Sequence, residues 1–167
     1  PVIDFGSQTA QLIARRVREA GAFSVLLSPR ASVDDVRALQ PKGIILSGGP
    51  ASVYADNAPS MDPGLLELGV PVLGICYGMQ LACRMMGARV DAADHREFGR
   101  AALHIVEPGD LLRGIPEHTA VWMSHGDQVS GLDRAELEVL GSTPTCAHAV
   151  VRTGASTERA FYGVQFH

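Results

Sequence analysis

The chain has 167 residues, of which 46% are hydrophobic and 19% charged, and its formal net charge is -4. These values fit one globular domain and offer no basic field that would attract nucleic acid or an anionic membrane surface. No apolar run approaches the roughly 18 residues of a membrane span, and the start lacks the basic leader of a signal peptide, so we expect a cytoplasmic location. Cys76, Cys83 and Cys146 form no CxxC pair, which predicts neither a disulfide framework nor a zinc site.

The first half alternates short apolar runs with helical patterns, which is typical of a parallel sheet with crossover helices. The expected strands are 2–5, 23–28, 43–47 and 71–75, and the expected helices are 8–20, 32–39, 61–68 and 78–86, with Ser32 capping the second helix. Beyond Gly87 the pattern changes to strands separated by turns, namely ARVDA, RAALHIV, AVWMS, LEVLGS, CAHAVVR and RAFYGVQF. We expect this half to extend or flank the sheet of an α/β domain.

GICYG at 74–78 places Cys76 on a tight turn from a strand to a helix, with a glycine two residues before it and two after it. This is the nucleophile-elbow pattern with cysteine in place of serine. The positive end of a helix stabilises a thiolate, which gives Cys76 a physical reason to be reactive. A buried structural cysteine beside a glycine turn remains an equal alternative for this motif alone.

SGGP at 47–50 closes the preceding strand, so its loop is expected at the same sheet edge as Cys76, where such sheets bind ligands. Glycines let main-chain N–H groups approach a substrate, and attack of a thiolate on a carbonyl needs donors aimed at the oxyanion. The main-chain N–H groups of Gly49 and Tyr77 are the candidates. Without Cys76, a glycine-rich turn that only reverses the chain would be the preferred interpretation.

A cysteine nucleophile needs a base, and six histidines are available: His95, His104, His118, His125, His148 and His167. Two of them fall inside alternating strand patterns (His104 and His148), and two fall in polar, turn-like stretches (His95 and His118). Each of these four is expected to be structural. His167 follows the apolar strand YGVQF, and His125 lies in a polar cluster at a strand end, so the residues alone rank these two equally.

That polar cluster is MSHGD at 123–127, which gathers a hydroxyl, an imidazole, a glycine and a carboxylate. Such a set suits recognition of a zwitterion, because an aspartate accepts hydrogen bonds from an ammonium group and free backbone N–H groups bind a carboxylate. A polar turn capped by Asp127 is an equally good interpretation of the same residues.

SGGP at 47–50, GICYGMQ at 74–80 and GVQFH at 163–167 together resemble the ordered signature of class I glutamine amidotransferases, and with DFGSQ at 4–8 the resemblance covers almost the whole chain. It implies a flavodoxin-like three-layer sandwich with a mostly parallel central sheet, and a Cys-His-Glu triad. It further implies that Cys76 attacks the side-chain amide of glutamine, with His167 as base. The remaining residues that the resemblance assigns are Gly49 and Tyr77 for the oxyanion, and Gln80, Ser124, His125, Gly126 and Asp127 for the glutamine pocket.

Within that family, MSHGD, DFGSQ and REFG at 96–99 are similar to the domains that serve GMP synthetases. In those enzymes the ammonia passes to an ATP-pyrophosphatase domain, which adenylates xanthosine monophosphate and aminates it to GMP. The resemblance implies glutamine as substrate and a synthetase domain or subunit for its partner, with a homodimer of the full enzyme as a further expectation. It implies no cofactor in residues 1–167, since ATP and Mg²⁺ would belong to the synthetase domain that this sequence lacks.

The family's triad continues His-Pro-Glu, whereas this sequence stops at His167, so we expect an amidotransferase domain truncated at its C-terminal end. Four alternatives stay open. The domain could serve another synthetase, such as the one that makes anthranilate, or act as a γ-glutamyl hydrolase. It could also be a module in which Cys76 is a redox-sensing thiol, or a non-catalytic remnant.

Overall fold

The computed structural model describes residues 1–155 and 157–167, apart from the side chains of residues 94 and 95. The expectation for the His95 side chain therefore lies outside the described residues. The first half contains β1 (Val2–Ile3), α1 (Ala10–Glu19), β2 (Leu26–Leu27), α2 (Val33–Ala38), β3 (Ile44–Leu46), the 3₁₀ helix η1 (Pro63–Glu67), β4 (Val72–Ile75) and α3 (Tyr77–Met85). The second half contains β5 (Arg89–Ile105), β6 (His118–Ser130), the 3₁₀ helix η2 (Leu132–Ala135), β7 (Leu137–Ser142), β8 (Val150–Thr153) and β9 (Phe161–Val164).

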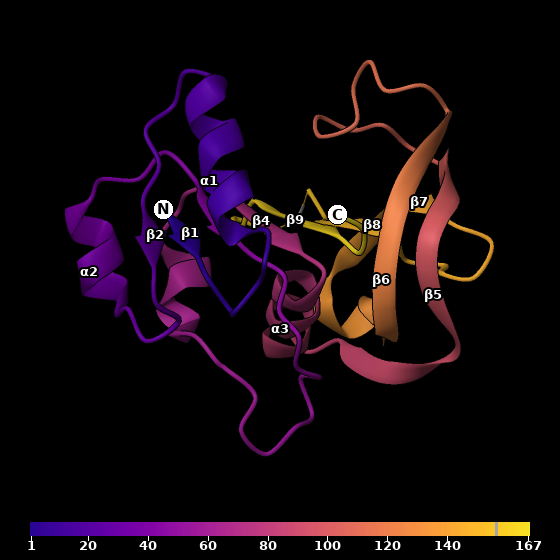
Figure 1. The fold of residues 1–167 in the computed structure, drawn as a ribbon, viewed down its shortest axis with the longest axis horizontal. Helices are drawn as coiled ribbons and strands as arrows, with labels where there is room; N and C mark the ends of the chain where they lie inside the picture. Colours follow the sequence, from indigo (N-terminus) through magenta and orange to yellow (C-terminus); the bar gives the residue numbers. More distant parts are fainter. Residues whose placement is uncertain (156) are drawn as a thin grey trace.

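Within the described residues the strands form one sheet of nine, in the order β2-β1-β3-β4-β9-β8-β7-β5-β6. The strands from β2 to β9 in this order are parallel, and the sheet continues through antiparallel β8, β7, β5 and β6 (Figure 1). The α/β class is confirmed, and so is the expectation that the strand-rich half extends the sheet. Because β4 and β9 are neighbours, the elbow after β4 lies beside the segment that ends at His167.

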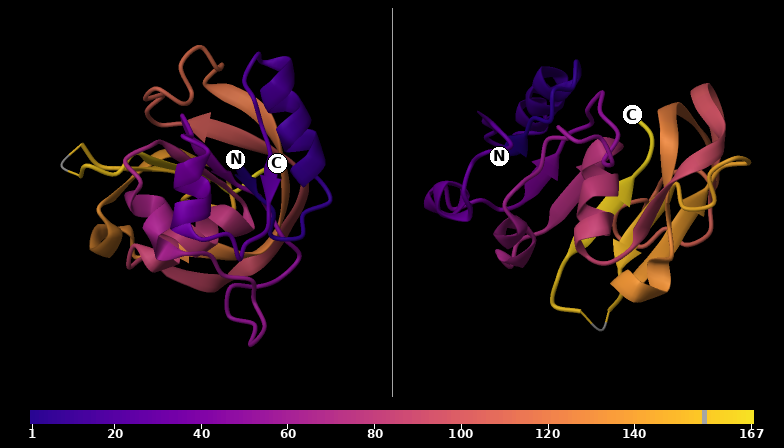
Figure 2. Two further views of the ribbon diagram at one scale, coloured as in Figure 1. Left: turned by 90° about the vertical axis from the view of Figure 1, so that its left-hand side faces the viewer. Right: turned by 90° about the horizontal axis from the view of Figure 1, so that it is seen from below.

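The helices cover both faces of the parallel strands. Figure 1 shows α1 and α3 on opposite sides of these strands, and Figure 2 gives two further views of the same arrangement. The main core packs α2, η1 and α3 on one face, through residues such as Val36, Leu65 and Met79. Among the helices of the described residues, none has the length and apolarity that crossing a bilayer requires.

Two expectations about the first half show how local chemistry sets an element. Ser32 caps α2 as expected, and it forms a reciprocal capping box with Asp35. The helix expected at 61–68 is instead the short 3₁₀ helix η1, whose first turn holds Pro63 and Gly64 and is capped by Asp62. A proline and a glycine in five residues favour a single tight turn over a longer α-helix.

The largest correction concerns the β5–β6 hairpin. ARVDA and RAALHIV were expected as separate strands, but both belong to one strand of 17 residues, and MSHGD lies inside β6 rather than in a turn at a strand end. The glycines that were expected to end these strands lie within the paired strands instead. The register of β5 shifts between Ala92 and Glu97, opposite the MSHGD segment. Such a bulge is a common device for aiming side chains at a site.

Three histidine placements were wrong. His95 and His118 were expected in turns, but His95 lies within β5 and His118 begins β6. His148 was expected in a strand but precedes β8. The ring Nδ1 of His148 lies 2.7 Å from the Val129 carbonyl oxygen, which fixes this connection to β6. His104 lies in β5 as expected, with an exposed side chain.

Candidate active site

Cys76 occupies a sharp turn between β4 and α3, and its φ of 50° is a value that residues other than glycine rarely adopt. Both flanking glycines are required by close approach. A Cβ on Gly74 would lie 2.7 Å from the Met79 Cα, and one on Gly78 would lie 2.5 Å from the Leu46 carbonyl oxygen. The elbow predicted from the sequence is therefore present, with strained backbone at the reactive position.

The SGGP loop after β3 lies against this elbow, as expected from the parallel topology. The Gly78 N–H donates to the Ser47 carbonyl oxygen over 3.0 Å, which ties the loop to the first turn of α3. Gly49 is also forced to be glycine, since a Cβ there would lie 2.8 Å from the Phe5 carbonyl oxygen. The backbone of Gly49 is thereby held close to the rest of the site.

One pocket of about 580 Å³ collects nearly all of the predicted residues. Its lining includes the predicted nucleophile Cys76, the two predicted oxyanion donors Gly49 and Tyr77, and the five predicted glutamine-binding residues Gln80, Ser124, His125, Gly126 and Asp127. These residues come from the loop after β3, the elbow with α3, and β6, which lie far apart in the sequence. The oxyanion and glutamine-binding roles themselves stay predictions.

The sequence analysis did not single out three residues that complete this site. Ser52 Oγ donates to Asp127 Oδ2 over 2.6 Å and so orients the carboxylate. Gln165 is fully buried, and its amide nitrogen lies 3.5 Å from Cys76 Sγ. Arg96, from the bulged part of β5, also lines the pocket. The positions of Gln165 inside GVQFH and of Arg96 inside REFG could have marked these two residues, whereas the contact of Ser52 with Asp127 depends on the tertiary fold.

Gln80 has a more internal position than the resemblance implies. Its side chain is buried, and its amide nitrogen donates both to the Asp127 carbonyl oxygen over 2.9 Å and to the Gln165 side-chain oxygen over 3.1 Å. These bonds join α3, β6 and the end of β9, so Gln80 supports the backbone that carries Asp127. A direct contact between Gln80 and the substrate stays a prediction.

The His125 ring is held at both nitrogens. Nδ1 lies 3.0 Å from the Asp127 carbonyl oxygen, and Nε2 lies 3.2 Å from a carboxylate oxygen of Glu97, which Thr143 also contacts. Both ring nitrogens therefore face acceptors, and both donate when the ring is an imidazolium. Neither nitrogen is turned toward the thiol, which favours His167 over His125 as the base.

His167 lies next to the elbow but does not line the pocket. A Cβ on Gly48 would lie 2.9 Å from the His167 Cε1 and 3.7 Å from the Cys76 Cβ, so the two residues flank Gly48. The main-chain N–H of His167 donates to the Trp122 carbonyl oxygen over 2.9 Å, which anchors the segment after β9 to β6. The structure gives no His167–Cys76 hydrogen bond among the described residues, and such bonds often tighten only when substrate is bound.

Burial determines the resting state of the thiol and outweighs the helix N-terminus on which the sequence analysis relied. It raises the pKa of Cys76 to about 11, although hydrogen bonds from the Tyr77 main chain and the Gln165 side chain act in the opposite direction. The negative charge of Asp127 adds to the increase of this pKa. The thiol is therefore protonated in the free protein, and attack requires the base that the sequence analysis expected.

The neighbouring imidazole is suited to that task. Burial, and then the positive charge of His125, lower the pKa of His167 from its ordinary value of 6.5. The ring is consequently neutral at pH 7 and gains its proton only as the pH falls through the lowered pKa. We predict that kcat/KM for glutamine is constant near neutrality and declines on an acid limb whose midpoint lies below pH 6.5. A pH profile with that midpoint above 6.5 would contradict the assignment of His167 as base.

Comparison with known proteins agrees with this geometry. The whole chain, residues 1–167, matches the family described as Glutamine amidotransferase class-I. The chain belongs to the class I glutamine amidotransferases. The structure of a Thermoplasma acidophilum protein described as a GMP synthase subunit has a TM-score of 0.85 at 26% identity, covering 99% of this chain and 81% of that one. A glutamine amidotransferase from Thermotoga maritima has a TM-score of 0.76 at 19% identity, covering 99% and 74%, and shows the shared fold.

Curated relatives are more similar in sequence. A GMP synthase [glutamine-hydrolyzing] from Trichormus variabilis is 51% identical over 166 residues, and one from Synechocystis is 48% identical over the same length. The match covers 99% of this chain but only 30% of each relative. The chain thus corresponds to less than a third of the length of these relatives.

Proposed function

We propose that this domain hydrolyses the side-chain amide of glutamine to glutamate and ammonia through a thioester on Cys76. The observation that carries the proposal is the single pocket in which Cys76, the Gly49 and Tyr77 main chains, and the Ser52-oriented Asp127 carboxylate come together. A nucleophile, oxyanion donors and an anchor for an ammonium group are the parts that amide hydrolysis of an amino acid needs.

Each step can be assigned to residues of this chain. His167 takes the thiol proton, the sulfur of Cys76 bonds to the amide carbon, and the carbonyl oxygen becomes an oxyanion facing the N–H groups of Gly49 and Tyr77. The C–N bond then breaks, the proton on His167 passes to the leaving nitrogen, and ammonia departs. Water that has lost a proton to His167 attacks the thioester, the C–S bond breaks, and glutamate leaves as the sulfur regains its proton.

The polar wall of the pocket suits the amino acid end of glutamine. Asp127 offers its carboxylate to the α-ammonium group, and Ser52 already holds one oxygen of that carboxylate in place. Arg96 lies on the same wall, where a Cβ added to Gly126 would be 3.6 Å from the Arg96 Nε. We infer that Arg96 faces the α-carboxylate, which together with Asp127 distinguishes a free amino acid from a peptide amide.

The relatives support a proposal for the ammonia acceptor. Those at about half identity are named GMP synthase, and the chain covers 30% of their length. We propose that a synthetase domain or subunit outside residues 1–167 uses the ammonia to convert XMP to GMP, that ATP and Mg²⁺ belong to that partner, and that this domain needs no cofactor. Three free cysteines fit a reducing, cytoplasmic setting.

The redox-sensor alternative has less support. A sensor thiol is exposed and has a low pKa, whereas Cys76 is buried and its pKa is raised to about 11. Service to a different synthetase and γ-glutamyl hydrolysis share the same nucleophile and pocket, so they differ only in the acceptor. GMP formation by the full-length protein from glutamine, XMP, ATP and Mg²⁺ tests the proposed acceptor. If the protein hydrolysed glutamine but formed no GMP, a different synthetase or γ-glutamyl hydrolysis would be favoured.

The nucleophile and its pocket can be tested together by mass spectrometry after treatment with 6-diazo-5-oxo-norleucine, a reactive glutamine analogue. We expect the label on Cys76, with Cys83 and Cys146 in the same sample unmodified because both are buried away from the pocket. Glutamine should protect Cys76 in proportion to its occupancy. Labelling that glutamine does not slow, or none at Cys76, would refute the proposed function.

Asp127→Ala is predicted to raise the KM for glutamine about tenfold to a hundredfold with a smaller effect on kcat, because a charge-assisted hydrogen bond to the ammonium group is lost. Ser52→Ala should raise KM by only a few-fold, since it removes one hydrogen bond that orients the carboxylate. Steady-state kinetics of both variants provides the measurement. A fall in kcat with KM unchanged in Asp127→Ala would contradict a binding role.

A further inference from the structure

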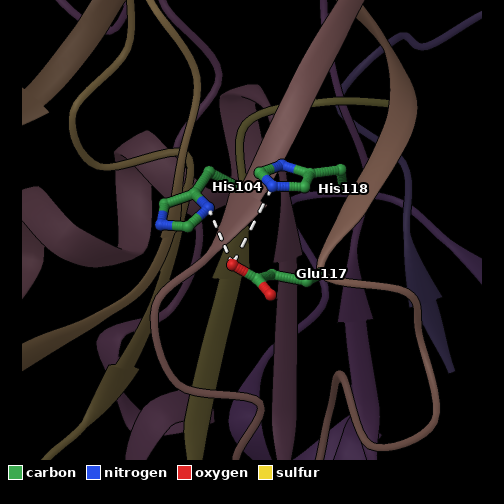
Figure 3. Close-up of side chains that lie close together, drawn as sticks. All are labelled: His104, Glu117 and His118. Carbon is green, nitrogen blue, oxygen red and sulfur yellow. Dashed lines mark ion pairs between the residues drawn. The ribbon is translucent and has the colours of Figure 1, made fainter.

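A second group of metal-ligating side chains lies where the β5–β6 hairpin opens into the loop at 106–117. His104 near the end of β5 and His118 at the start of β6 are directly paired across the strands, so both side chains lie on the same face. Glu117 immediately precedes β6, and its carboxylate turns back between the two rings (Figure 3).

The ligand atoms of the three side chains lie close to one another. Glu117 Oε1 lies 3.7 Å from His104 Nδ1 and 3.9 Å from His118 Nε2. One ring nitrogen of each histidine and one carboxylate oxygen of Glu117 all lie within 4.8 Å of one another. The two imidazole rings stack with centroids 5.3 Å apart and an interplanar angle of 25°, which holds the nitrogens on the same side as the carboxylate. Figure 3 shows both dashed contacts meeting at a single carboxylate oxygen.

Ion pairing gives little reason for this arrangement. The side chains of His104, Glu117 and His118 are 51%, 68% and 72% exposed, and ion pairs at such positions contribute little stability. Both N···O separations also exceed hydrogen-bond length. The nitrogens and the carboxylate thus face one another across a gap that solvent can reach.

We propose that His104, Glu117 and His118 form a surface site for Zn²⁺. Imidazole nitrogen and carboxylate oxygen are ligands that Zn²⁺ uses, at about 2.0–2.2 Å, which in a tetrahedral site places neighbouring ligand atoms about 3.4 Å apart. The N···O separations of 3.7 and 3.9 Å need to contract by a few tenths of an ångström, and the two ring nitrogens, which lie within 4.8 Å of each other, need to approach as well. Three protein ligands leave one position for water or another ligand, and His104 and Glu117 border a surface hollow of about 450 Å³ that gives it room.

The zinc site is separate from the glutaminase pocket and does not rest on the proposed function. Five residues of extended β6 lie between His118 and Ser124, so six residue steps separate them, a distance of about 20 Å at the usual rise of a strand. A metal here would instead join β5 and β6 at the point where the loop leaves the sheet. Binding therefore should not depend on whether Cys76 reacts with glutamine.

Calorimetric titration of ZnCl₂ into the full-length protein tests the proposal, with Cys76→Ser in every sample so that the active-site thiol cannot contribute. We expect the protein to bind about one equivalent of Zn²⁺ per chain. His104→Ala and His118→Ala should each weaken this binding at least about tenfold, and Glu117→Gln should weaken it less. Glu107→Gln is the matched control, because Glu107 is an exposed carboxylate of the same loop that pairs with Arg152. Unchanged Zn²⁺ binding in both histidine variants would overturn the site.

A second measurement avoids substitutions in the cluster. Diethyl pyrocarbonate modifies exposed imidazoles, and peptide mass spectrometry can follow His104 and His118 separately from the half-buried His148. Zn²⁺ is expected to slow modification of His104 and His118 at least about tenfold while the rate at His148 stays the same. If Zn²⁺ left the modification rate of each of the three histidines unchanged, the proposal would be refuted.

Discussion

Cys76→Ser is expected to lower glutamine hydrolysis by at least about 10³-fold while the protein stays folded. A serine hydroxyl loses its proton far less readily than a thiol, and this environment already penalises the anion, since burial raises the pKa of Cys76 to about 11. The substitution replaces one atom and leaves the side chain attached at the same strained φ, so the elbow should keep its geometry. Release of ammonia from glutamine measures the effect.

Cys83→Ala provides the matched control. Cys83 is a fully buried thiol on α3, the helix that follows the elbow, but it does not line the pocket. Its loss should leave the rate of hydrolysis within a few-fold of the unmodified protein. If Cys76→Ser hydrolysed glutamine at an undiminished rate, the thioester mechanism would be wrong.

Sequence patterns predicted much of what positions this nucleophile. Alternation of apolar strands and amphipathic helices gave the order of elements up to α3, and the glycines around Cys76 gave the elbow, because both depend on local backbone sterics. The β5–β6 hairpin was divided wrongly at its glycines. There, pairing with a partner strand overrides the local preference for a turn, and that pairing is not visible in a short window.

The contacts between side chains were harder to predict for a related reason. Ser52 and Asp127 are 75 residues apart, and β6 is far from β3 in the sheet order, so they meet only because β6 folds back against the elbow, where Gln80 donates to the Asp127 carbonyl oxygen. The depth at which Cys76 lies was equally hidden, so its pKa was expected to fall and instead rises. The choice between His125 and His167 required the acceptors that face the His125 ring, one of which is Glu97.

His167→Gln is predicted to lower kcat by about 10²–10⁴-fold with little change in KM, because the amide keeps the polarity of the side chain but cannot exchange a proton near neutral pH. His167 does not line the glutamine pocket, so binding should survive its loss. The acid limb of the pH profile should disappear with it, since the group that titrates below pH 6.5 has been removed. His148→Gln is the control, because its ring bonds to Val129 and does not line the pocket.

A second substitution tests the position of the imidazole without removing it. A Cβ at Gly48 would lie 2.9 Å from the His167 Cε1, closer than normal van der Waals contact, so Gly48→Ala must displace the ring or the loop. We expect kcat to fall in this variant too, by about tenfold or more, since a shift of roughly 1 Å in a proton-transfer partner is costly. If both His167→Gln and Gly48→Ala kept the wild-type kcat, His167 would not be the base. If only Gly48→Ala kept it, the ring would tolerate displacement.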